Sequence, residues 1–145
     1  MNIMLEDIIK LLLAVVIGGL LGAEREYHEK AAGLRTIICI CVGATLFTIF
    51  STRLGTSEDP TRIAAGIVTG IGFLGAGVII RQEGHIRGLT SAATIWIAAA
   101  LGMGIGGGFY YLSVIAAIII VIVLLFFRQI ENWFQRFHKH NHPAG

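Results

Sequence analysis

The chain has 145 residues, of which 55% are hydrophobic and only 14% charged, well below the roughly one quarter that is usual in soluble domains. Its mean hydropathy is +0.78. Its formal net charge is only +2, and we expect no nucleic-acid partner. The apolar residues form long blocks between short charged stretches, which is the pattern of a membrane protein. We therefore expect no separate soluble domain.

We predict an all-α integral membrane protein, a bundle of about five transmembrane helices. We expect the first apolar segment to be a mature helix and not a cleaved signal, because Glu6 and Asp7 precede it and no small-residue cleavage site follows it. The apolar segments are Ile8 to Ala23, Thr36 to Phe50, Ile63 to Ile80, Leu89 to Met103 and Phe109 to Phe127.

The glycine spacing in the third segment matches a dinucleotide-binding fingerprint, Gly70-x-Gly72-x-x-Gly75. Such a site needs a strand before the glycines and an acid about twenty residues after them, and this segment has neither. We therefore interpret these glycines, together with Gly66 and Gly77, as helix-packing residues. Because glycine also weakens helices, a straight, tightly packed helix is the favoured expectation and a broken helix the alternative.

Small residues recur in the first segment, where Gly18-x-x-x-Gly22 places two glycines on one helix face. We expect the protein to form a homodimer through this face. The third segment is expected to use its glycines inside the bundle, since they occupy several sides of the helix. A glycine-rich turn, Gly102 to Gly108, is expected to separate the last two helices.

Basic residues in the short loops predict the orientation. With five spans, the amino-terminal side receives Lys10, Arg53 and Arg62. The other side receives Arg25, Lys30, Arg35, Arg81, Arg87, Arg128, Arg136 and Lys139. The amino terminus is therefore expected outside, and the carboxyl terminus in the cytoplasm.

Four polar motifs that are distant in sequence meet at the cytoplasmic face if this topology is right. We predict that Glu24, costly at the membrane boundary unless paired, forms an ion pair with a nearby arginine. For the arginines, ordinary cytoplasmic anchoring is an equally good interpretation. The Ser91 hydroxyl can donate a hydrogen bond at the same face. The predicted functional charged cluster is Glu24, Arg25, Arg35, Thr36, Arg81, Arg87 and Thr90.

Other candidate sites are weaker. Cys39 and Cys41 lie about 200° apart around a helix, so we expect buried free cysteines that neither bridge nor share a metal. The tail carries His138, His140 and His142 on a segment expected to be disordered, where any metal binding would be adventitious. No catalytic constellation is recognisable, so we expect no enzyme, no cofactor and no metal site.

The ordered motifs "GGLLGAEREYHEKAAGLRT", "DPTRIAAGIVTGIGFLGAGVIIR" and "RGLTSAATIWIAAALGMGIGGGFY" resemble the membrane domain of the MgtC/SapB (YhiD-like) inner-membrane proteins. The resemblance runs from about Leu11 to Leu125. It implies a transmembrane domain over residues 1–127 and a short cytoplasmic tail over 128–145, without the soluble carboxyl-terminal domain of virulence-associated relatives. The matching motif positions are Glu24, Arg25, Gly33, Leu34, Arg35, Thr36, Gly70, Gly72, Phe73, Gly75, Ala76, Gly77, Arg81, Gly88, Leu89, Thr90, Ala93 and Trp96.

The resemblance implies a bacterial inner-membrane regulatory protein linked to low-magnesium adaptation. Relatives have been proposed to inhibit the rotary ATP synthase by direct contact in the membrane. The alternative is a small oligomeric ion or solute transporter or channel built around Glu24 and the arginines. Cation pathways usually carry acids within the span, and the third, fourth and fifth segments contain none, which favours the regulatory hypothesis.

Overall fold

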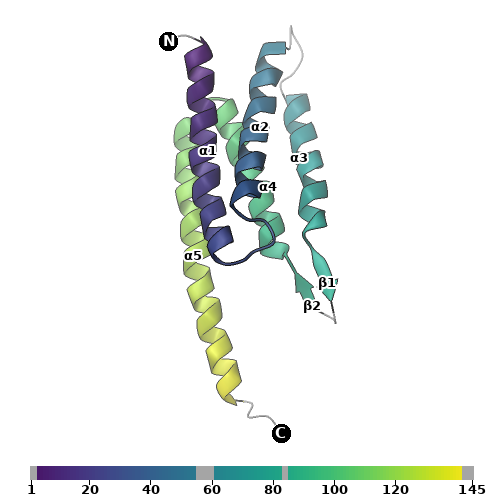
Figure 1. Cartoon of the computed structure of the whole chain (residues 1–145), viewed down its shortest axis with the longest axis vertical. Coiled ribbons are helices and arrows are strands. Elements are labelled where there is room, and N and C mark those ends of the chain that lie inside the picture. Colours follow the sequence, from purple (N-terminus) through teal and green to yellow (C-terminus); the bar gives the residue numbers. More distant parts are fainter. Residues whose placement is uncertain (1–2, 55–60, 83–84, 142–145) are drawn as a thin grey trace.

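The computed structural model describes residues 3–54, 61–82 and 85–141 (Figure 1). Five helices account for most of this part of the chain, which confirms the predicted all-α membrane fold. The helices are α1 (Ile3–Tyr27), α2 (Leu34–Leu54), α3 (Thr61–Gly77), α4 (Leu89–Gly106) and α5 (Tyr110–Asn141). Two short strands, β1 (Ile80–Gln82) and β2 (His85–Arg87), connect α3 to α4.

Three of the described helices are long and apolar enough to cross a membrane, over Leu34–Arg53, Leu89–Gly106 and Tyr110–Phe127. The apolar helix α3 is shorter, with 17 residues. The 25-residue helix α1 has charges near both ends and lies alongside α2 (Figure 1). The apolar part of α1 therefore occupies the same layer as α2.

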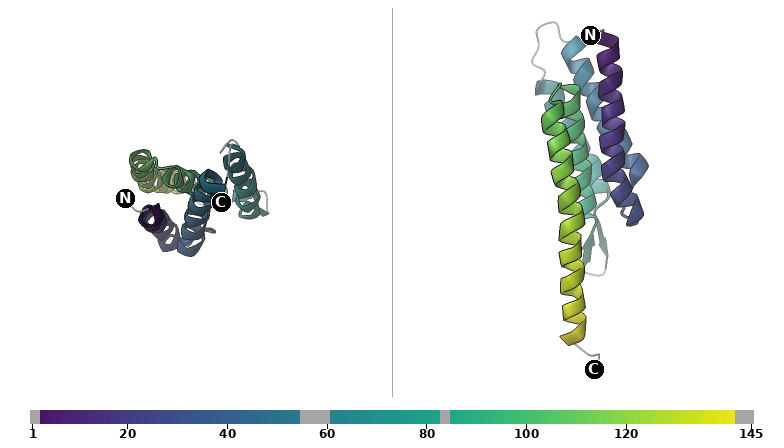
Figure 2. Two further views of the ribbon diagram at one scale, coloured as in Figure 1. Left: turned by 90° about the horizontal axis from the view of Figure 1, so that it is seen from above. Right: turned by 90° about the vertical axis from the view of Figure 1, so that its left-hand side faces the viewer.

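Successive helices run in opposite directions, so the connections between them lie at two opposite ends of the helix bundle (Figure 1). The α1–α2 connection and the β-hairpin lie at one end, which we call the hairpin end. The amino terminus lies at the opposite end. Helix α5 continues beyond the other helices at the hairpin end (Figure 2). Residues 128–141 are thus helical, and the expectation of a disordered tail is wrong for His138 and His140; His142 lies outside the described residues.

The core lies among α1, α2 and α4, with α5 packed against α1 and α4. Seen from above, α3 stands at the edge of the group (Figure 2). Among its residues, Gly75 is the buried one. The fully buried large side chains all belong to the three central helices: Leu21, Ile37, Ile95, Ile105, Thr45 and Cys41.

Helices α2 and α4 approach most closely where α4 carries Gly102 and Gly106. A Cβ atom at Gly102 would overlap the carbonyl oxygen of Cys41, and one at Gly106 would lie 2.8 Å from the carbonyl oxygen of Thr45. The Thr45 hydroxyl lies 2.9 Å from the carbonyl oxygens of both Cys41 and Gly102, so it links the two helices. The expected turn from Gly102 was therefore placed too early, because these glycines serve helix packing and α4 continues to Gly106.

The α1 glycines pack inside the chain and most of the α3 glycines do not, so the prediction that α3, and not α1, uses its glycines inside the bundle is wrong. Gly18 and Gly22 pack inside the chain, where an added Cβ atom would lie 3.0 Å from Ile38 Cα and 2.8 Å from Leu34 Cα of α2, respectively. On α3, Gly75 faces α4, and a Cβ atom there would lie 3.7 Å from Ala92 Cβ. No described heavy atom lies within 4 Å of a Cβ atom added to the other α3 glycines, Gly66, Gly70, Gly72 and Gly77.

Helix α3 is continuous from Thr61 to Gly77, so it is not broken, but the expected tight packing is wrong, because Gly75 is its one buried residue. Its predicted end at Ile80 is wrong, because Ile80 begins β1 and pairs with Arg87 of β2 in an antiparallel hairpin. The hairpin leads into α4 through Gly88, which has a left-handed φ of 90°. A side chain there would also overlap the carbonyl oxygen of Val78, so the turn requires glycine.

Candidate functional site

A buried arginine joins α1 to α4 at the hairpin end. Arg25 lies in the last turn of α1 and Ser91 near the start of α4, and the two residues are 2% and 3% exposed. The Arg25 Nη2 atom donates a hydrogen bond of 3.0 Å to Ser91 Oγ. Because the guanidinium is charged at any physiological pH, this bond is charge-assisted and stronger than a neutral one. It ties together helix ends that are 66 residues apart in sequence.

Glu24 supplies the negative charge beside Arg25. Its Oε2 atom lies 3.7 Å from Arg25 Nη1, and its side chain is 6% exposed. On the other side, His28 Nδ1 lies 3.2 Å from Glu24 Oε1 and 2.7 Å from the Glu24 carbonyl oxygen. Both of these oxygens are acceptors, so we assign the hydrogen of the His28 ring to Nδ1. Glu24 is therefore held between a cation and a donor.

Two polar atoms of the cluster lack a hydrogen bond within the described structure. Arg25 Nε and Glu24 Oε2 are buried and have no hydrogen-bond partner there. Arg25 lies beyond the apolar stretch Ile8 to Ala23, and burial lowers the pKa of its guanidinium while Glu24 raises it. The charges of Arg25 and Glu24 thus compensate one another, and removal of either would leave a buried charge alone.

The chain after Arg25 is fixed by backbone bonds that end α1. Lys30 N donates to Arg25 O and Glu29 N donates to Glu26 O, each over 3.0 Å, which is the Schellman pattern of a helix end. Glu29 takes the left-handed position with φ 51°. Glu26 then turns back and accepts a 2.9 Å hydrogen bond from Leu34 N, capping the start of α2. A side chain at Gly33 would overlap the Glu26 carboxylate.

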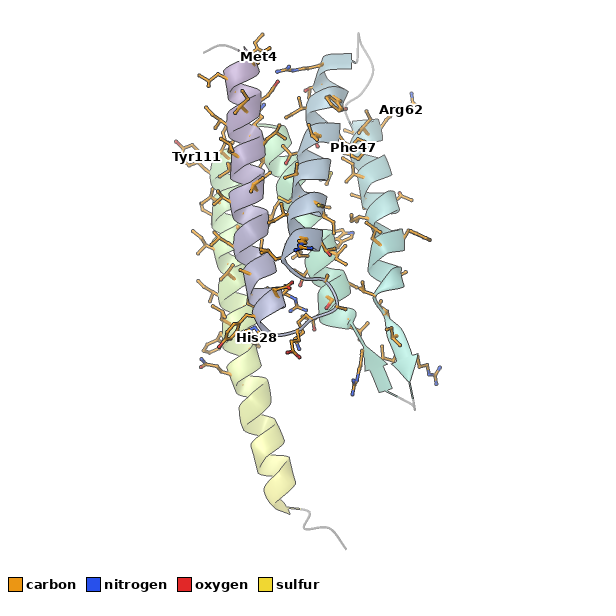
Figure 3. All side chains as sticks on the ribbon, viewed as in Figure 1. Met4, His28, Phe47, Arg62 and Tyr111 are labelled. Atoms are coloured by element: carbon orange, nitrogen blue, oxygen red, sulfur yellow. The ribbon has the colours of Figure 1, made fainter. Side chains whose placement is uncertain are left out.

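The structure brings Glu24 and Arg25 of the predicted cluster into contact, and it adds His28 and Ser91. The hydrophilic residues Arg35 and Thr36, at the start of α2, are exposed, as are Arg81, Arg87 and Thr90 around the hairpin. His28 was missed as a site residue, although its spacing of four from Glu24 on a helix was a usable signal. Figure 3 shows His28 at the hairpin end of α1.

Cys39 and Cys41 are both free, as expected. Cys41 is buried, but Cys39 is exposed, so the prediction of two buried cysteines was wrong for Cys39. The two face different surroundings because they lie about 200° apart around α2. Cys41 packs in the core, whereas Cys39 lies on the side of α2 toward α3.

A second cluster of polar side chains links the helices at the end of the bundle opposite the hairpin. Glu6 accepts hydrogen bonds from Lys10 and from the Tyr110 hydroxyl, at 3.1 Å each, so it links α1 to α5. Asp7 pairs with Arg53, which links α1 to α2. These contacts lie at the surface, where ion pairs contribute little to stability. They fix the register of the helices at this end.

The fold and the site define a polytopic all-α membrane protein whose polar side chains gather at the two ends of its helices. Residues 11–133 match the MgtC family, and the chain belongs to that family. It is 48% identical over 95 residues to Protein MgtC of Brucella abortus and 48% identical over 101 residues to Protein MgtC of Salmonella typhimurium. These matches cover 66% and 70% of this chain, but only 40% and 43% of the relatives. No solved structure matches the chain.

Proposed function

We propose that this protein is a regulatory protein of the bacterial inner membrane that acts by helix contact with another membrane complex. The observation that carries the proposal is the outer face of α3. Four small residues lie there at helical spacing, and all of them are exposed: Ala65, Thr69, Gly72 and Ala76. We call this row the small face of α3.

The small face has the properties of a transmembrane contact surface. Small side chains let two helix backbones approach closely, which is how membrane helices associate without a hydrophobic driving force. The Thr69 hydroxyl donates to Ala65 O at 2.9 Å, so its hydrogen bond is made within α3 and its methyl group is available for packing. Phe73, 82% exposed, projects beside the row and offers a large apolar contact.

We infer that the partner is the rotary ATP synthase and that the contact serves adaptation to low magnesium. Membership of the MgtC family supports this assignment. In the proposed orientation the hairpin end faces the cytoplasm, together with the Arg25 site, and the amino terminus faces outward. The basic residues of the α1–α2 connection and of the hairpin support that orientation.

We also propose that the protein forms a homodimer. The contact surface is now the small face of α3, and not the α1 face expected from the sequence. Gly18 and Gly22 already contact α2 inside the chain, whereas all four residues of the small face are exposed in the described structure. A second copy and the partner complex would then compete for the same face.

The transporter hypothesis is less well supported. The membrane-crossing stretches of α2, α4 and α5 contain no Asp or Glu, and neither does α3. A cation pathway through these helices would lack the acids that usually line one.

The test is ATP-driven proton pumping by purified ATP synthase, co-reconstituted in liposomes with this protein. Wild type should lower the pumping rate, and Gly72→Leu on the small face should remove the effect. Ala100→Leu, an exposed position on α4, is the matched control and should inhibit like wild type. Pumping that is unchanged by wild-type protein would reject the synthase as partner. Ion or solute flux through liposomes that lack the synthase, abolished by Glu24→Ala, would establish the transporter instead.

A further inference from the structure

The β-hairpin between α3 and α4 presents all of its described side chains to the surroundings. In β1, Ile80 is 59% exposed and Arg81 is exposed as well. In β2, Ile86 is 56% exposed, and its neighbour Arg87 is also exposed. A hairpin of two strands without a packing partner is only marginally stable in water. A surface from outside the chain that covers these side chains would therefore stabilise it.

The hairpin lies at the boundary of the membrane. The apolar helix α3 ends at Gly77, shortly before β1, and the membrane-crossing stretch of α4 begins at Leu89, two residues after Arg87. Helix α3 stands at the edge of the helix group, and the hairpin projects from its end (Figures 1 and 2). At this depth the surroundings of the bundle are lipid head groups.

The hairpin carries an excess of positive charge. Residues 80–88 contain Arg81 and Arg87 against one acid, Glu83, which lies outside the described residues. No acid of the described residues forms an ion pair with either arginine. The α1–α2 connection at the same end is balanced, because residues 26–35 contain two acids and two bases besides His28. The hairpin, unlike that connection, has charge left to meet an anion from outside the chain.

The strand register gives each face of the hairpin one arginine and one isoleucine. Arg81 lies opposite Ile86, and Ile80 lies opposite Arg87. Directly opposed residues share a face, with Cβ atoms about 5 Å apart, and successive residues of a strand point to opposite faces. Each face therefore offers a cation beside an aliphatic side chain. That combination matches the head group of a phospholipid and the start of its acyl chains.

We propose that each face of the hairpin binds the head group of an anionic phospholipid, through Arg81 on one face and Arg87 on the other. A guanidinium recognises phosphate through paired, charge-assisted hydrogen bonds. A zwitterionic head group satisfies it less well, because its own cation competes for the phosphate. The isoleucine beside each arginine lies at the boundary between head groups and acyl chains. Selection of a lipid goes beyond the rule for basic loops, which concerns orientation alone. The proposal does not depend on the regulatory activity.

Photo-crosslinking from one face of the hairpin tests this proposal. The photoreactive residue p-benzoylphenylalanine replaces Ile86 in the full chain, which is reconstituted in liposomes of equal parts phosphatidylglycerol and phosphatidylcholine. Mass spectrometry then compares the yields of the two lipid adducts. Phosphatidylglycerol adducts should exceed phosphatidylcholine adducts several-fold. Arg81→Gln, on the same face as position 86, should bring the ratio close to one.

Arg87→Gln is the matched control, because it removes the same charge from the other face of the same hairpin. It should leave the adduct ratio at position 86 largely unchanged. With the photoreactive residue in place of Ile80, the two variants should exchange roles. Arg87→Gln should then remove the preference for phosphatidylglycerol, and Arg81→Gln should keep it.

Three results would overturn the proposal. Equal yields of the two lipid adducts, with both arginines present, would show that the hairpin does not select the head group. Equal loss of the preference with either arginine variant at both positions would show that general positive charge attracts the lipid, and not a binding face. Adducts with a second copy of the chain in place of lipid would show that protein covers the hairpin.

Discussion

Arg25 is the residue on which the hairpin end depends, because it is charged, almost fully buried and bonded to another helix. Its hydrogen bond to Ser91 and its ion pair with Glu24 were only partly predictable. The sequence indicated an acid and a base at the boundary of the first apolar segment. Their pairing was predicted only because an unpaired charge at the membrane boundary is unfavourable in free energy. No local pattern predicted that Arg25 would turn inward to α4 while Arg35, at the start of α2, would stay exposed. That choice depends on how α1 and α4 cross.

Arg25→Gln should be strongly destabilising, because it leaves Glu24 as an uncompensated charge with little exposure. We expect a loss of about 3 to 5 kcal/mol in unfolding free energy, the range for one partner of a buried pair. Ser91→Ala should cost less, about 1 to 3 kcal/mol, since one donor of Arg25 loses its acceptor. Unfolding in mild detergent would measure both. If the double variant Glu24→Gln, Arg25→Gln were as unstable as the sum of its single variants, the pair would not be coupled.

Glu29→Gly should stabilise the protein. Glu29 has φ 51°, a left-handed conformation that costs a residue with a side chain roughly 1 to 2 kcal/mol and costs glycine much less. We expect a gain of about 1 kcal/mol, reduced by the greater freedom of glycine in the unfolded chain. Glu29→Ala is the control, since alanine keeps the strain. Equal stability of the two variants would contradict this explanation.

At the scale of the helices, the apolar segments were predictable because their length and composition reflect the bilayer directly. The roles of the glycines were not. Three helices carry closely spaced small residues, and the sequence patterns of α1, α3 and α4 are alike. Only the neighbouring backbone decides which of them are packed: α2 lies against Gly22 of α1 and Gly102 of α4, whereas α3 stands aside. The hairpin escaped prediction for a similar reason, since strands of three residues have too little pattern to detect.

Two glycine-to-alanine changes should have opposite effects. Gly102→Ala places a Cβ atom against the Cys41 carbonyl oxygen, so α2 and α4 must separate, and we expect a loss of about 1 to 3 kcal/mol. Gly72→Ala meets no described atom within 4 Å and should gain up to about 1 kcal/mol from its higher helix propensity. Thermal unfolding of both variants would compare them. Destabilisation by Gly72→Ala would show that α3 is packed on its small face even in the isolated protein.

At the scale of the whole molecule, the alternating helix directions decide which features lie together at each end of the bundle. The Arg25 site, the hairpin and the carboxyl-terminal part of α5 share one end, and the amino terminus and Arg62 lie at the other (Figures 1 and 3). Helix α5 extends 14 residues past Phe127, about 21 Å at 1.5 Å per residue, so it continues well beyond its apolar stretch at the hairpin end. The orientation proposed above places the Arg25 site, the hairpin and the end of α5 together on the cytoplasmic side of the membrane.

Single-cysteine labelling would establish the orientation. In a Cys39→Ser, Cys41→Ser background, Glu29→Cys reports on the hairpin end and Tyr111→Cys, at a position 87% exposed, reports on the opposite end. A membrane-impermeant maleimide added to intact cells should modify position 111 and spare position 29, because the excess of basic residues at the hairpin end predicts a cytoplasmic location for that end. Lysis should make position 29 reactive, which shows that it was protected by the membrane and not by the fold. Modification of position 29 alone in intact cells would show that the topology is inverted and that the Arg25 site lies outside.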